Sequence, residues 1–380
     1  MKKHFYAVWE NYYPNSASSN RMLAYMEAWS KLDVEVTMVI MLPDRKYSRV
    51  DVSYSNIRII YLWDRLPVHN YLIQNILLGY YIYSFIKRLK TGDSIFLYGQ
   101  AFLMDKLLNS RKTIHVYQER TEHPLIVHPG HWPYKVSIKT YLRDCTKLDG
   151  MFVISSPLQK FFEESGLKKG TVYVVNMIVD PRRFEGVRKS DKNKKYIAYC
   201  GNASNNKDGV DQLIKAFALI SPKYQDIYLY VIGKAPDSNE ENNNAHLAEE
   251  LGVGDKVIFT GMVKADDMPQ LLTDADILAL DRPDSLQAQN GFPTKLGEYL
   301  ITGNPVVVTS VGDIPLFLKD GVSAMIAEPS NPEQFAAKLE WLLNNRDDAC
   351  KIGEQGKRVA LKFFNSDTEA KKIVDVIIKA

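Results

Sequence analysis

Short apolar segments and longer amphipathic segments alternate along this chain, and that alternation restricts the fold more than any other feature of the sequence. Runs such as Val34–Ile40 ("VEVTMVI") are rich in β-branched residues, whereas segments such as 19–32 ("SNRMLAYMEAWSKL") have the spacing of amphipathic helices. The alternation stops at a polar, lysine-rich stretch, 182–195, and then starts again with "KYIAYCG". Strands that alternate with helices predict parallel sheets covered by helices, so the pattern predicts two α/β domains joined by a linker.

The length of the chain agrees with two domains, because 380 residues are more than one hydrophobic core usually serves. We place a first Rossmann-like domain at residues 1–185 and a second at 186–364, and we expect residues 365–380 to form a helix that packs back on the first domain. Both domains are predicted to be doubly wound parallel sheets. Two such domains facing a cleft provide a natural place for a ligand.

The composition excludes several classes of function. Lys and Arg exceed Asp and Glu by only three (48 minus 45), which does not indicate a nucleic-acid partner. The cysteines Cys145, Cys200 and Cys350 lie far apart, which argues against a structural zinc site and favours a reducing compartment. The N-terminal segment has no continuous apolar core and no segment is apolar enough to span a membrane, so we expect a cytoplasmic protein.

One segment, 71–90 ("YLIQNILLGYYIYSFIKRLK"), is apolar and rich in tyrosine and ends in a basic cluster. The plainer interpretation is a core helix of the first domain. The alternative is a helix whose outer face rests on lipid, because aromatic and basic side chains suit the membrane–water interface. The second interpretation predicts a peripheral contact with the inner face of the cell membrane.

A short helix that begins near Pro293 carries the clearest candidate site. Proline lacks an N–H and suits the first helical position, and the free N–H groups that follow it form an anion site. Lys295 adds a positive charge, and Gly291 allows a ligand to approach the backbone closely. Glu298 lies on roughly the same face as Lys295 and suits an acceptor of hydrogen bonds from ribose hydroxyls. The alternative is a surface ion pair between Lys295 and Glu298.

A second cluster follows the first strand of the second domain. In "YCGNASNNKDGV", Gly201 ends a strand and a polar loop leads to Lys207. Rossmann-like domains bind phosphate at this position, although the G-x-G-x-x-G fingerprint is missing after both opening strands, which argues against a nicotinamide dehydrogenase. Because both clusters lie at the carboxyl edge of one predicted sheet, we expect Lys207 and Lys295 to flank a diphosphate, with Arg282 as a third cation.

These motifs resemble those of glycosyltransferase family 4, whose members are retaining enzymes of the GT-B fold that use nucleotide sugars. The family carries two glutamates separated by seven residues, and the second is followed by G-x-P-V-V. In "NGFPTKLGEYLITGNPVVV", Glu298 matches the second glutamate and Asn290 stands in place of the first. Lys207 matches the lysine of the family's phosphate loop, and Asn202 stands where many members have an arginine. The resemblance covers nearly the whole chain and is sharpest after residue 195.

The resemblance implies a role for each matching residue. Glu298 should hold the ribose hydroxyls, Thr294 should meet the diphosphate, and Gly291 and Phe292 should lie beside the transferred sugar. The predicted donor-binding residues are Gly201, Asn202, Lys207, Arg282, Asn290, Gly291, Phe292, Thr294, Lys295 and Glu298. Lys207 and Asn290 are also predicted to act in catalysis.

The first domain should bind the acceptor. In "HVYQERTEHP", Glu119 and Glu122 are expected to follow a buried strand and to position the acceptor, and the alternative is an ordinary solvated charge cluster. His115, His128 and His131 lack the spacing of metal ligands. The resemblance implies that no metal or cofactor is needed, because a helix dipole and basic side chains neutralise the leaving diphosphate.

The resemblance implies a retaining glycosyltransferase that moves a sugar from a nucleoside-diphosphate donor, such as a UDP-sugar or a GDP-sugar. The acceptor would be a glycan or a lipid-linked sugar, in the synthesis of a bacterial surface polysaccharide. Two alternatives stay open. One is a nucleotide-sugar epimerase of the same fold, which needs no acceptor groove, and the other is a GT-B scaffold subunit that has lost transfer.

Overall fold

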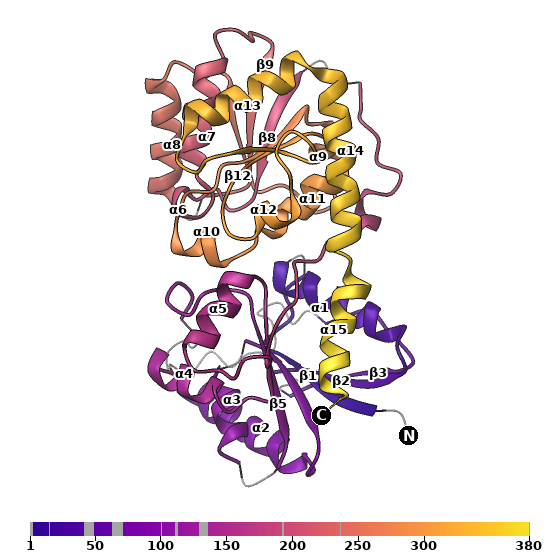
Figure 1. The fold of residues 1–380 in the computed structure, drawn as a ribbon. Coiled ribbons are helices and arrows are strands. Elements are labelled where there is room, and N and C mark those ends of the chain that lie inside the picture. Colours follow the sequence, from indigo (N-terminus) through magenta and orange to yellow (C-terminus); the bar gives the residue numbers. More distant parts are fainter. Residues whose placement is uncertain are drawn as a thin grey trace. The chain divides into compact units, whose positions relative to one another are not determined.

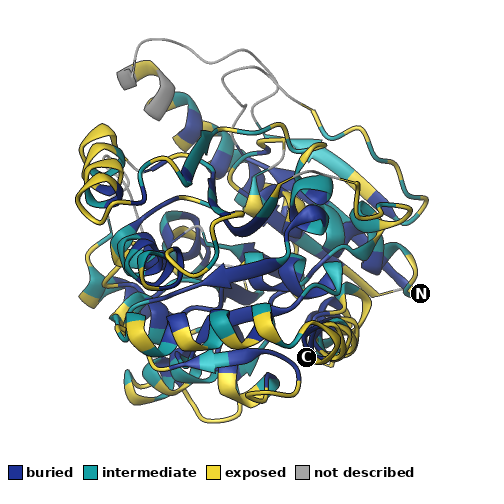
Figure 2. Ribbon diagram, turned by 90° about the horizontal axis from the view of Figure 1, so that it is seen from above, coloured by how far each residue is buried: buried dark blue, intermediate teal, exposed yellow. Residues whose placement is uncertain are grey.

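The chain folds into two compact units in the computed structural model, one formed by Met1–Asn176 with Ser366–Ala380 and the other by Met177–Asn365 (Figure 1). We call them unit 1 and unit 2. The residues that the structure describes are 3–14, 16–41, 49–62, 71–99, 101–110, 113–128, 136–191, 194–235 and 237–379. In both units the strands are largely buried, and the outward faces of the helices are exposed (Figure 2).

Unit 1 is built on a seven-stranded sheet with the strand order β3-β2-β1-β4-β5-β6-β7, and the pairing between neighbours is parallel throughout. Its strands are β1 (Lys3–Trp9), β2 (Val34–Ile40), β3 (Ile57–Tyr61), β4 (Ser94–Tyr98), β5 (His115–Arg120), β6 (Gly150–Val153) and β7 (Val172–Val174). Its helices are α1 (Ala17–Ser30), α2 (Tyr71–Arg88), α3 (Ala101–Leu108), α4 (Ile138–Cys145), α5 (Ser156–Glu164) and α15 (Ser366–Ile377). The strand order reverses direction beside β1, as in doubly wound sheets.

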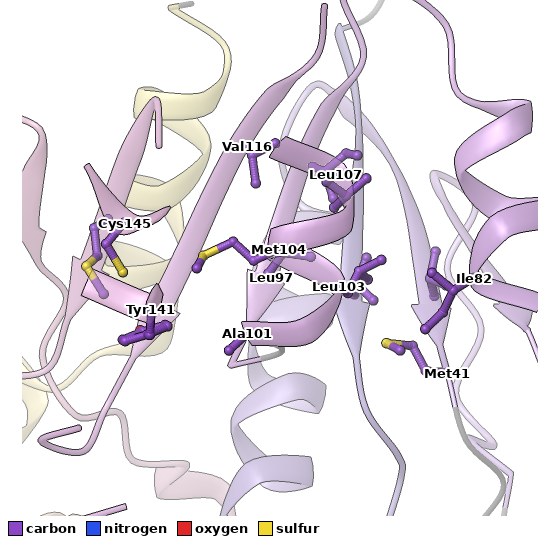
Figure 3. Packing of buried hydrophobic residues seen from close by; sticks show 14 of the residues in the cluster. Met41, Ile82, Leu97, Ala101, Leu103, Met104, Leu107, Val116, Tyr141 and Cys145 are labelled. Atoms are coloured by element: carbon purple, nitrogen blue, oxygen red, sulfur yellow. The ribbon is translucent and has the colours of Figure 1, made fainter. Parts of the chain in front are cut away.

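Apolar side chains cover one face of this sheet and meet the helices α2, α3 and α4. Leu97 of β4 and Val116 of β5 belong to a buried cluster with Ile82, Leu103 and Tyr141 of these helices (Figure 3). Successive strand residues point to opposite faces, so the neighbours of these residues face the other side of the sheet. Apolar side chains of the strands are therefore buried on both faces of this sheet.

The other face of the sheet packs on α1 and α15. The Trp29 ring of α1 meets the Phe5 ring edge to face at 5.2 Å, and the Trp29 indole N–H donates to the carbonyl of Ala370 at 3.0 Å. Ser16 caps the start of α1 by accepting from the Ser19 N–H. The last helix of the chain thus belongs to the same compact unit as the first strand.

Helix α2 has two apolar faces. Leu78, Ile82 and Phe85 are buried in the core, whereas Tyr80 and Tyr83 are 64% and 66% exposed. The buried face is that of a core helix, as in the plainer interpretation. The exposed tyrosines are the side chains on which the membrane interpretation depends. In the part of the chain that the structure describes, we find no helix with the length and hydropathy needed to cross a bilayer.

Unit 2 is built on a six-stranded parallel sheet with the order β10-β9-β8-β11-β12-β13. Its strands are β8 (Lys195–Cys200), β9 (Ile227–Ile232), β10 (Val257–Gly261), β11 (Ile277–Leu280), β12 (Val306–Thr309) and β13 (Met325–Ala327). Its helices are η1 (Pro181–Phe184), α6 (Asn205–Asp208), α7 (Val210–Ile220), α8 (Ser238–Glu250), α9 (Met268–Asp274), α10 (Leu286–Asn290), α11 (Thr294–Thr302), α12 (Ile314–Phe317), α13 (Pro332–Asn344) and α14 (Arg346–Phe363). Both sheets thus have the predicted doubly wound order.

The polar stretch predicted to be a linker belongs to unit 2 instead. The chain passes from one unit to the other between Asn176 and Met177, ahead of the expected boundary at 185/186. Ser190 donates its backbone N–H to Asp274 at 2.7 Å, and Lys189 lies 3.1 Å from Asp276. The stretch lacks apolar periodicity because its polar groups pair with acids of unit 2. Residues 192 and 193 of this stretch, and His131, lie outside the described residues.

Candidate functional site

The turn after β8 brings two loops of unit 2 into backbone contact. Gly201 has a φ of 152°, and a Cβ atom there would lie 2.2 Å from the Lys295 Nζ. Gly233, at the end of β9, has a φ of 121°, and its Cβ would lie 1.9 Å from the Gly201 carbonyl oxygen. Ala203 donates its N–H to the carbonyl of Lys234 at 3.1 Å. Glycine is therefore required at both strand ends.

Lys295 reaches from α11 to the underside of this turn. Its Nζ donates to the carboxylate of Asp208 and to the Tyr199 hydroxyl, the latter at 3.0 Å, and it lies 4.7 Å from the centre of the Tyr199 ring. Asp208 is buried, and the Lys295 side chain is 16% exposed. Burial lowers the pKa of Lys295, and the charge of Asp208 opposes that effect. Lys295 is thus held against Asp208, and the surface ion pair with Glu298 considered from the sequence is absent from the described contacts.

Arg282 is buried below the loop that carries Lys207. Its Nε donates to the Lys207 carbonyl at 3.2 Å and lies 3.8 Å from the Asp208 carboxylate, and the side chain is 2% exposed. Gly209 follows with a φ of 64°, and a Cβ there would lie 1.8 Å from the Asp281 carbonyl. Arg282, expected as a third cation beside the diphosphate, thus supports the backbone of the loop that carries Lys207. Lys207 itself is half-buried.

Glu298, one turn beyond Lys295 on α11, forms an ion pair with Arg183 of η1. Both side chains remain partly accessible, at 31% for Arg183 and 27% for Glu298. Burial raises the pKa of the Glu298 carboxyl, while the positive charge of Arg183 lowers it. Sequence reasoning missed Arg183, because it lies 115 residues from its partner and the only local signal is the basic pair in "PRRF".

The residues just ahead of α11 are more buried than expected. Asn290 donates its side-chain amide to the Leu286 carbonyl at 3.0 Å, and the Gly291 N–H donates to the Gln287 carbonyl at 2.9 Å, so both complete α10. The Phe292 ring is 7% exposed and packs 5.3 Å from the Phe364 ring. This side chain therefore fills an aromatic core, which differs from the expected place beside a sugar.

The start of α11 is accessible. Pro293 is the N-cap and not the first helical residue, so the helix begins at Thr294, which is exposed. Asn202, in the turn after β8, is also exposed. Cys200, the last residue of β8, lies near both ion pairs. Burial raises the pKa of its thiol to about 12, and the charges of Glu298 and Lys295 both act on it. The phosphate-type turn and the Glu298 carboxylate therefore lie around the end of the same strand.

A profile of the family described as "Glycosyl transferases group 1" matches residues 182–359, which carry the glycine turn, the start of α11 and the two ion pairs. This part of the chain belongs to that family. The chain is similar to the mannosylfructose-phosphate synthase of Agrobacterium fabrum, with 25% identity over 277 residues, or 69% of this chain and 56% of the relative. It is also similar to spore coat protein SA of Bacillus subtilis, with 27% identity over 190 residues, or 49% of each chain. The chain spans about half the length of these curated relatives.

Solved structures agree on the fold over the whole chain. The Anabaena protein Alr3699/HepE, solved in complex with UDP, superposes with a TM-score of 0.72 at 15% identity and covers 100% of both chains. The sucrose-phosphate synthase of Thermosynechococcus elongatus gives a TM-score of 0.75 at 14% identity, with coverage of 100% and 99%. The chain therefore has the GT-B fold of glycosyltransferases.

Glu119, the predicted acceptor residue in unit 1 of this GT-B chain, is sealed in the core. It lies within β5, not after it, and its Oε1 accepts from Arg21 at 2.6 and 2.8 Å and from the Tyr25 hydroxyl at 2.9 Å. Glu119 is 1% exposed, and burial raises its pKa while the charge of Arg21 opposes that effect. The geometry contradicts a solvated position for this side chain. Glu122 is half-buried, and its carbonyl accepts from Arg120 at 3.1 Å.

Two of the histidines named from the sequence, His115 and His128, lie among the described residues. His115 contacts Asp149 at 2.9 Å through its Nδ1. Within the described ranges, no cluster of three or more His, Cys, Asp or Glu side chains has the geometry to hold a metal ion. The site described here consists of two ion pairs, a glycine turn and a helix start, all in unit 2.

Proposed function

We propose that this protein is a retaining glycosyltransferase that takes its sugar from a nucleoside-diphosphate donor bound by unit 2. The observation that carries the proposal is the arrangement along α11. This helix places Lys295 under the Gly201 turn and, one turn later, presents a Glu298 carboxylate that is still 27% exposed. A phosphate-type turn beside an accessible acid suits a ligand that carries both anionic phosphates and neutral hydroxyls.

In the proposed complex, Glu298 accepts hydrogen bonds from the two ribose hydroxyls. The diphosphate lies over the turn at Gly201 and Asn202, where the N–H groups at the start of α11, Thr294 and Lys207 meet it. The Asp208–Lys295 pair and Arg282 hold the loop in place from below. UDP is the first candidate nucleotide, because a protein of the same fold has been solved with UDP bound.

The proposed reaction breaks the bond between the anomeric carbon of the sugar and the phosphate oxygen. The acceptor hydroxyl oxygen forms the new bond on the same face, and its proton passes to the departing phosphate oxygen, so atoms and charges balance. Lys207 and the positive end of α11 stabilise the negative charge that develops on the diphosphate. We propose that these groups replace a metal ion. Asn290 and Phe292 support the sugar-facing loop from its buried side.

Unit 1 is the proposed acceptor unit, for a glycan or lipid-linked sugar of a bacterial surface polysaccharide. The exposed face of α2 supports a position at the inner face of the cell membrane, because Ile76, Tyr80 and Tyr83 point outward and Lys87 and Arg88 end the helix. Glu122, near the carboxyl end of β5, is the remaining candidate for positioning the acceptor.

Two measurements test this proposal. A thermal-shift panel of UDP, GDP, ADP and their sugars should identify one nucleotide that raises the melting temperature, since a ligand that binds only the folded state stabilises it. With that donor, free nucleoside diphosphate should appear only when a sugar acceptor such as octyl glucoside is present, and EDTA should leave the rate unchanged. Isomerisation of the donor sugar without an acceptor would indicate an epimerase. Binding without either reaction, over a broad acceptor panel, would indicate a scaffold.

A further inference from the structure

Arg183 joins α11, which carries Glu298, to the segment between β10 and α9. Its Nη1 pairs with Glu298 on α11, and its Nη2 lies 3.4 Å from the Ala265 carbonyl, in the segment between β10 and α9. We propose that Arg183 is a positioning residue for the nucleoside, which keeps Glu298 ionised and directed at the ribose hydroxyls. This inference rests on the proposed function, because it assigns Arg183 a task in binding the same donor.

The neighbouring arginine shows that this contact is specific to Arg183. Arg182 folds back on the same turn of η1, with its Nε 2.7 Å and its Nη2 2.8 Å from the Asp180 carboxylate. Two adjacent guanidinium groups therefore serve different acids, one local and one 115 residues away. The local pair holds the turn, and among the described contacts the arginine paired with Glu298 on α11 is Arg183. Arg182 is thus a matched control within the same short helix.

The charge state of Glu298 determines what the carboxylate can do for a ribose. An ionised carboxylate accepts hydrogen bonds from both hydroxyls, whereas the acid form carries a proton of its own and loses acceptor capacity. Burial raises the pKa of Glu298 and so favours the acid form, and Arg183 is the charge that opposes it. The partial exposure of both side chains leaves room for ligand hydroxyls to reach the carboxylate.

The other titratable groups near Glu298 do not take over this task. The Cys200 thiol of β8 faces it, and burial raises its pKa to about 12, so that the thiol is neutral. Tyr299, the next residue on α11, is also neutral because burial raises its pKa well above the usual value. Lys295, one turn earlier, is committed to a different acid. Among the residues described, Arg183 is therefore the cation that is paired with Glu298.

The test compares UDP with 2′,3′-dideoxy-UDP, which lacks the hydroxyls that Glu298 would accept from. Affinities are measured by titration calorimetry for the wild type, Arg183→Gln and Arg182→Gln at pH 8 and pH 6. We expect Arg183→Gln to weaken UDP binding about tenfold at pH 8, because a charge-assisted contact is lost, and to leave dideoxy-UDP nearly unchanged. Arg182→Gln should match the wild type with both nucleotides.

The pH dependence separates positioning from plain structural support. Without Arg183 the pKa of Glu298 rises further, so protonation begins at a higher pH and UDP affinity falls further as the pH drops from 8 to 6. The wild type should keep its affinity over that interval. Arg183→Lys keeps the charge and should restore the pH profile of the wild type, and it also provides the test if Arg183→Gln does not fold.

Four results would overturn this role. Equal weakening of both nucleotides with an unchanged pH profile would mean that Arg183 only supports the fold. Tighter UDP binding by Arg183→Gln would mean that the arginine competes with the ribose for Glu298. If the wild type bound none of UDP, GDP and ADP, the proposed function would fail and this role with it, whereas normal binding by the wild type and by Arg183→Gln would remove this role alone.

Discussion

Two Glu–Arg pairs, one in each unit, have the same chemistry and opposite environments. Arg21 and Glu119 in unit 1 are sealed, with side-chain exposures of 5% and 0%. Arg183 and Glu298 in unit 2 are 31% and 27% exposed. Burial raises the pKa of both glutamates, and an arginine opposes the shift in both. Accessibility therefore separates an ion pair that holds a fold from one whose carboxylate a ligand can reach.

The sealed pair also ties separate segments of unit 1 together. Arg21 donates to the Asn176 carbonyl at 3.2 Å, and the Asn176 N–H donates to the buried Glu369 of α15 at 2.8 Å. Glu119 thus takes part, through Arg21, in fixing the last residue of the first segment of unit 1. Removing one member of such a pair leaves an uncompensated buried charge, which costs far more than the pair gains on forming.

Arg21→Gln should have the largest effect on stability. We expect the free energy of unfolding to fall by about 3–5 kcal/mol, because Glu119 would remain buried without its cation. Urea denaturation followed by circular dichroism measures this change. The double variant Arg21→Met with Glu119→Leu removes both charges and should recover most of the loss. A loss below about 1 kcal/mol in the single variant would contradict the distinction between the two pairs.

Asp281, a third acid, is buried, and unlike Glu119 and Glu298 it has no paired cation among the described contacts. It therefore shows the effect of burial without an arginine. It is 1% exposed, and burial, with a contribution from Asp211, raises its pKa to about 8. The raised pKa means that the folded state holds a proton that the unfolded state releases above about pH 4, so stability falls as the pH rises from 4 to 8.

Asp281→Asn should remove this pH dependence. The variant should gain on the order of 2–4 kcal/mol over the wild type between pH 5 and pH 8, measured as free energy of unfolding at both values. Asp284→Asn, at an exposed position on the following loop, provides the control and should show no such gain. A constant difference across the pH range would mean that Asp281 is already ionised in the folded protein.

Glu298→Gln tests the accessible pair. Affinity for the nucleoside diphosphate should fall about 30-fold, because the amide is a weaker acceptor than the carboxylate, while the free energy of unfolding should change by about 1 kcal/mol or less. Titration calorimetry and thermal melting measure the two quantities. Glu119→Gln should show the reverse pattern, with a large loss of stability and an intrinsic nucleotide affinity that changes little. If the two variants behaved alike, exposure would not be the deciding property.

The smallest effect is expected where both partners are open to water. Lys31 and Asp367 lie 2.9 Å apart, with side-chain exposures of 52% and 53%. Lys31→Ala should lower the free energy of unfolding by about 0.5 kcal/mol or less, and the difference should shrink in 1 M NaCl because salt screens exposed charges. A loss above about 1 kcal/mol would show that this contact supports the packing of α15 on α1.

The alternation of segments predicts the two sheets because each strand carries its own local signal. Val34–Ile40 and Lys195–Cys200 are strands over nearly the expected bounds. Helix α14 was not predicted, since Gly353 and Gly356 lower helix propensity. A Cβ at Gly353 would lie 2.1 Å from a backbone oxygen of a neighbouring turn, so close packing requires the residue that weakens the local signal.

Part of the site can also be predicted from the sequence, because local signals are visible there and distant partners are not. Lys207, Lys295 and Glu298 stand out because strand–loop–helix transitions are visible in the sequence. Their partners are not visible, since Lys295 meets an acid 87 residues away and Glu298 meets Arg183 across 115 residues. Nothing in the local pattern of Glu119 indicated that a distant arginine would seal it. Local chemistry predicts which groups are available, and tertiary pairing decides which of them a ligand can reach.

The division of unit 1 into two stretches of sequence has a consequence for biosynthesis. Residues 366–380 leave the ribosome only after all of unit 2 has been made. Until then, the Trp29 indole N–H lacks the Ala370 carbonyl and the Asn176 N–H lacks Glu369. Unit 2 is one continuous segment and can therefore fold before unit 1, which needs its second segment, 366–380. A chain that ends at residue 365 would therefore contain all of unit 2 and an incomplete unit 1.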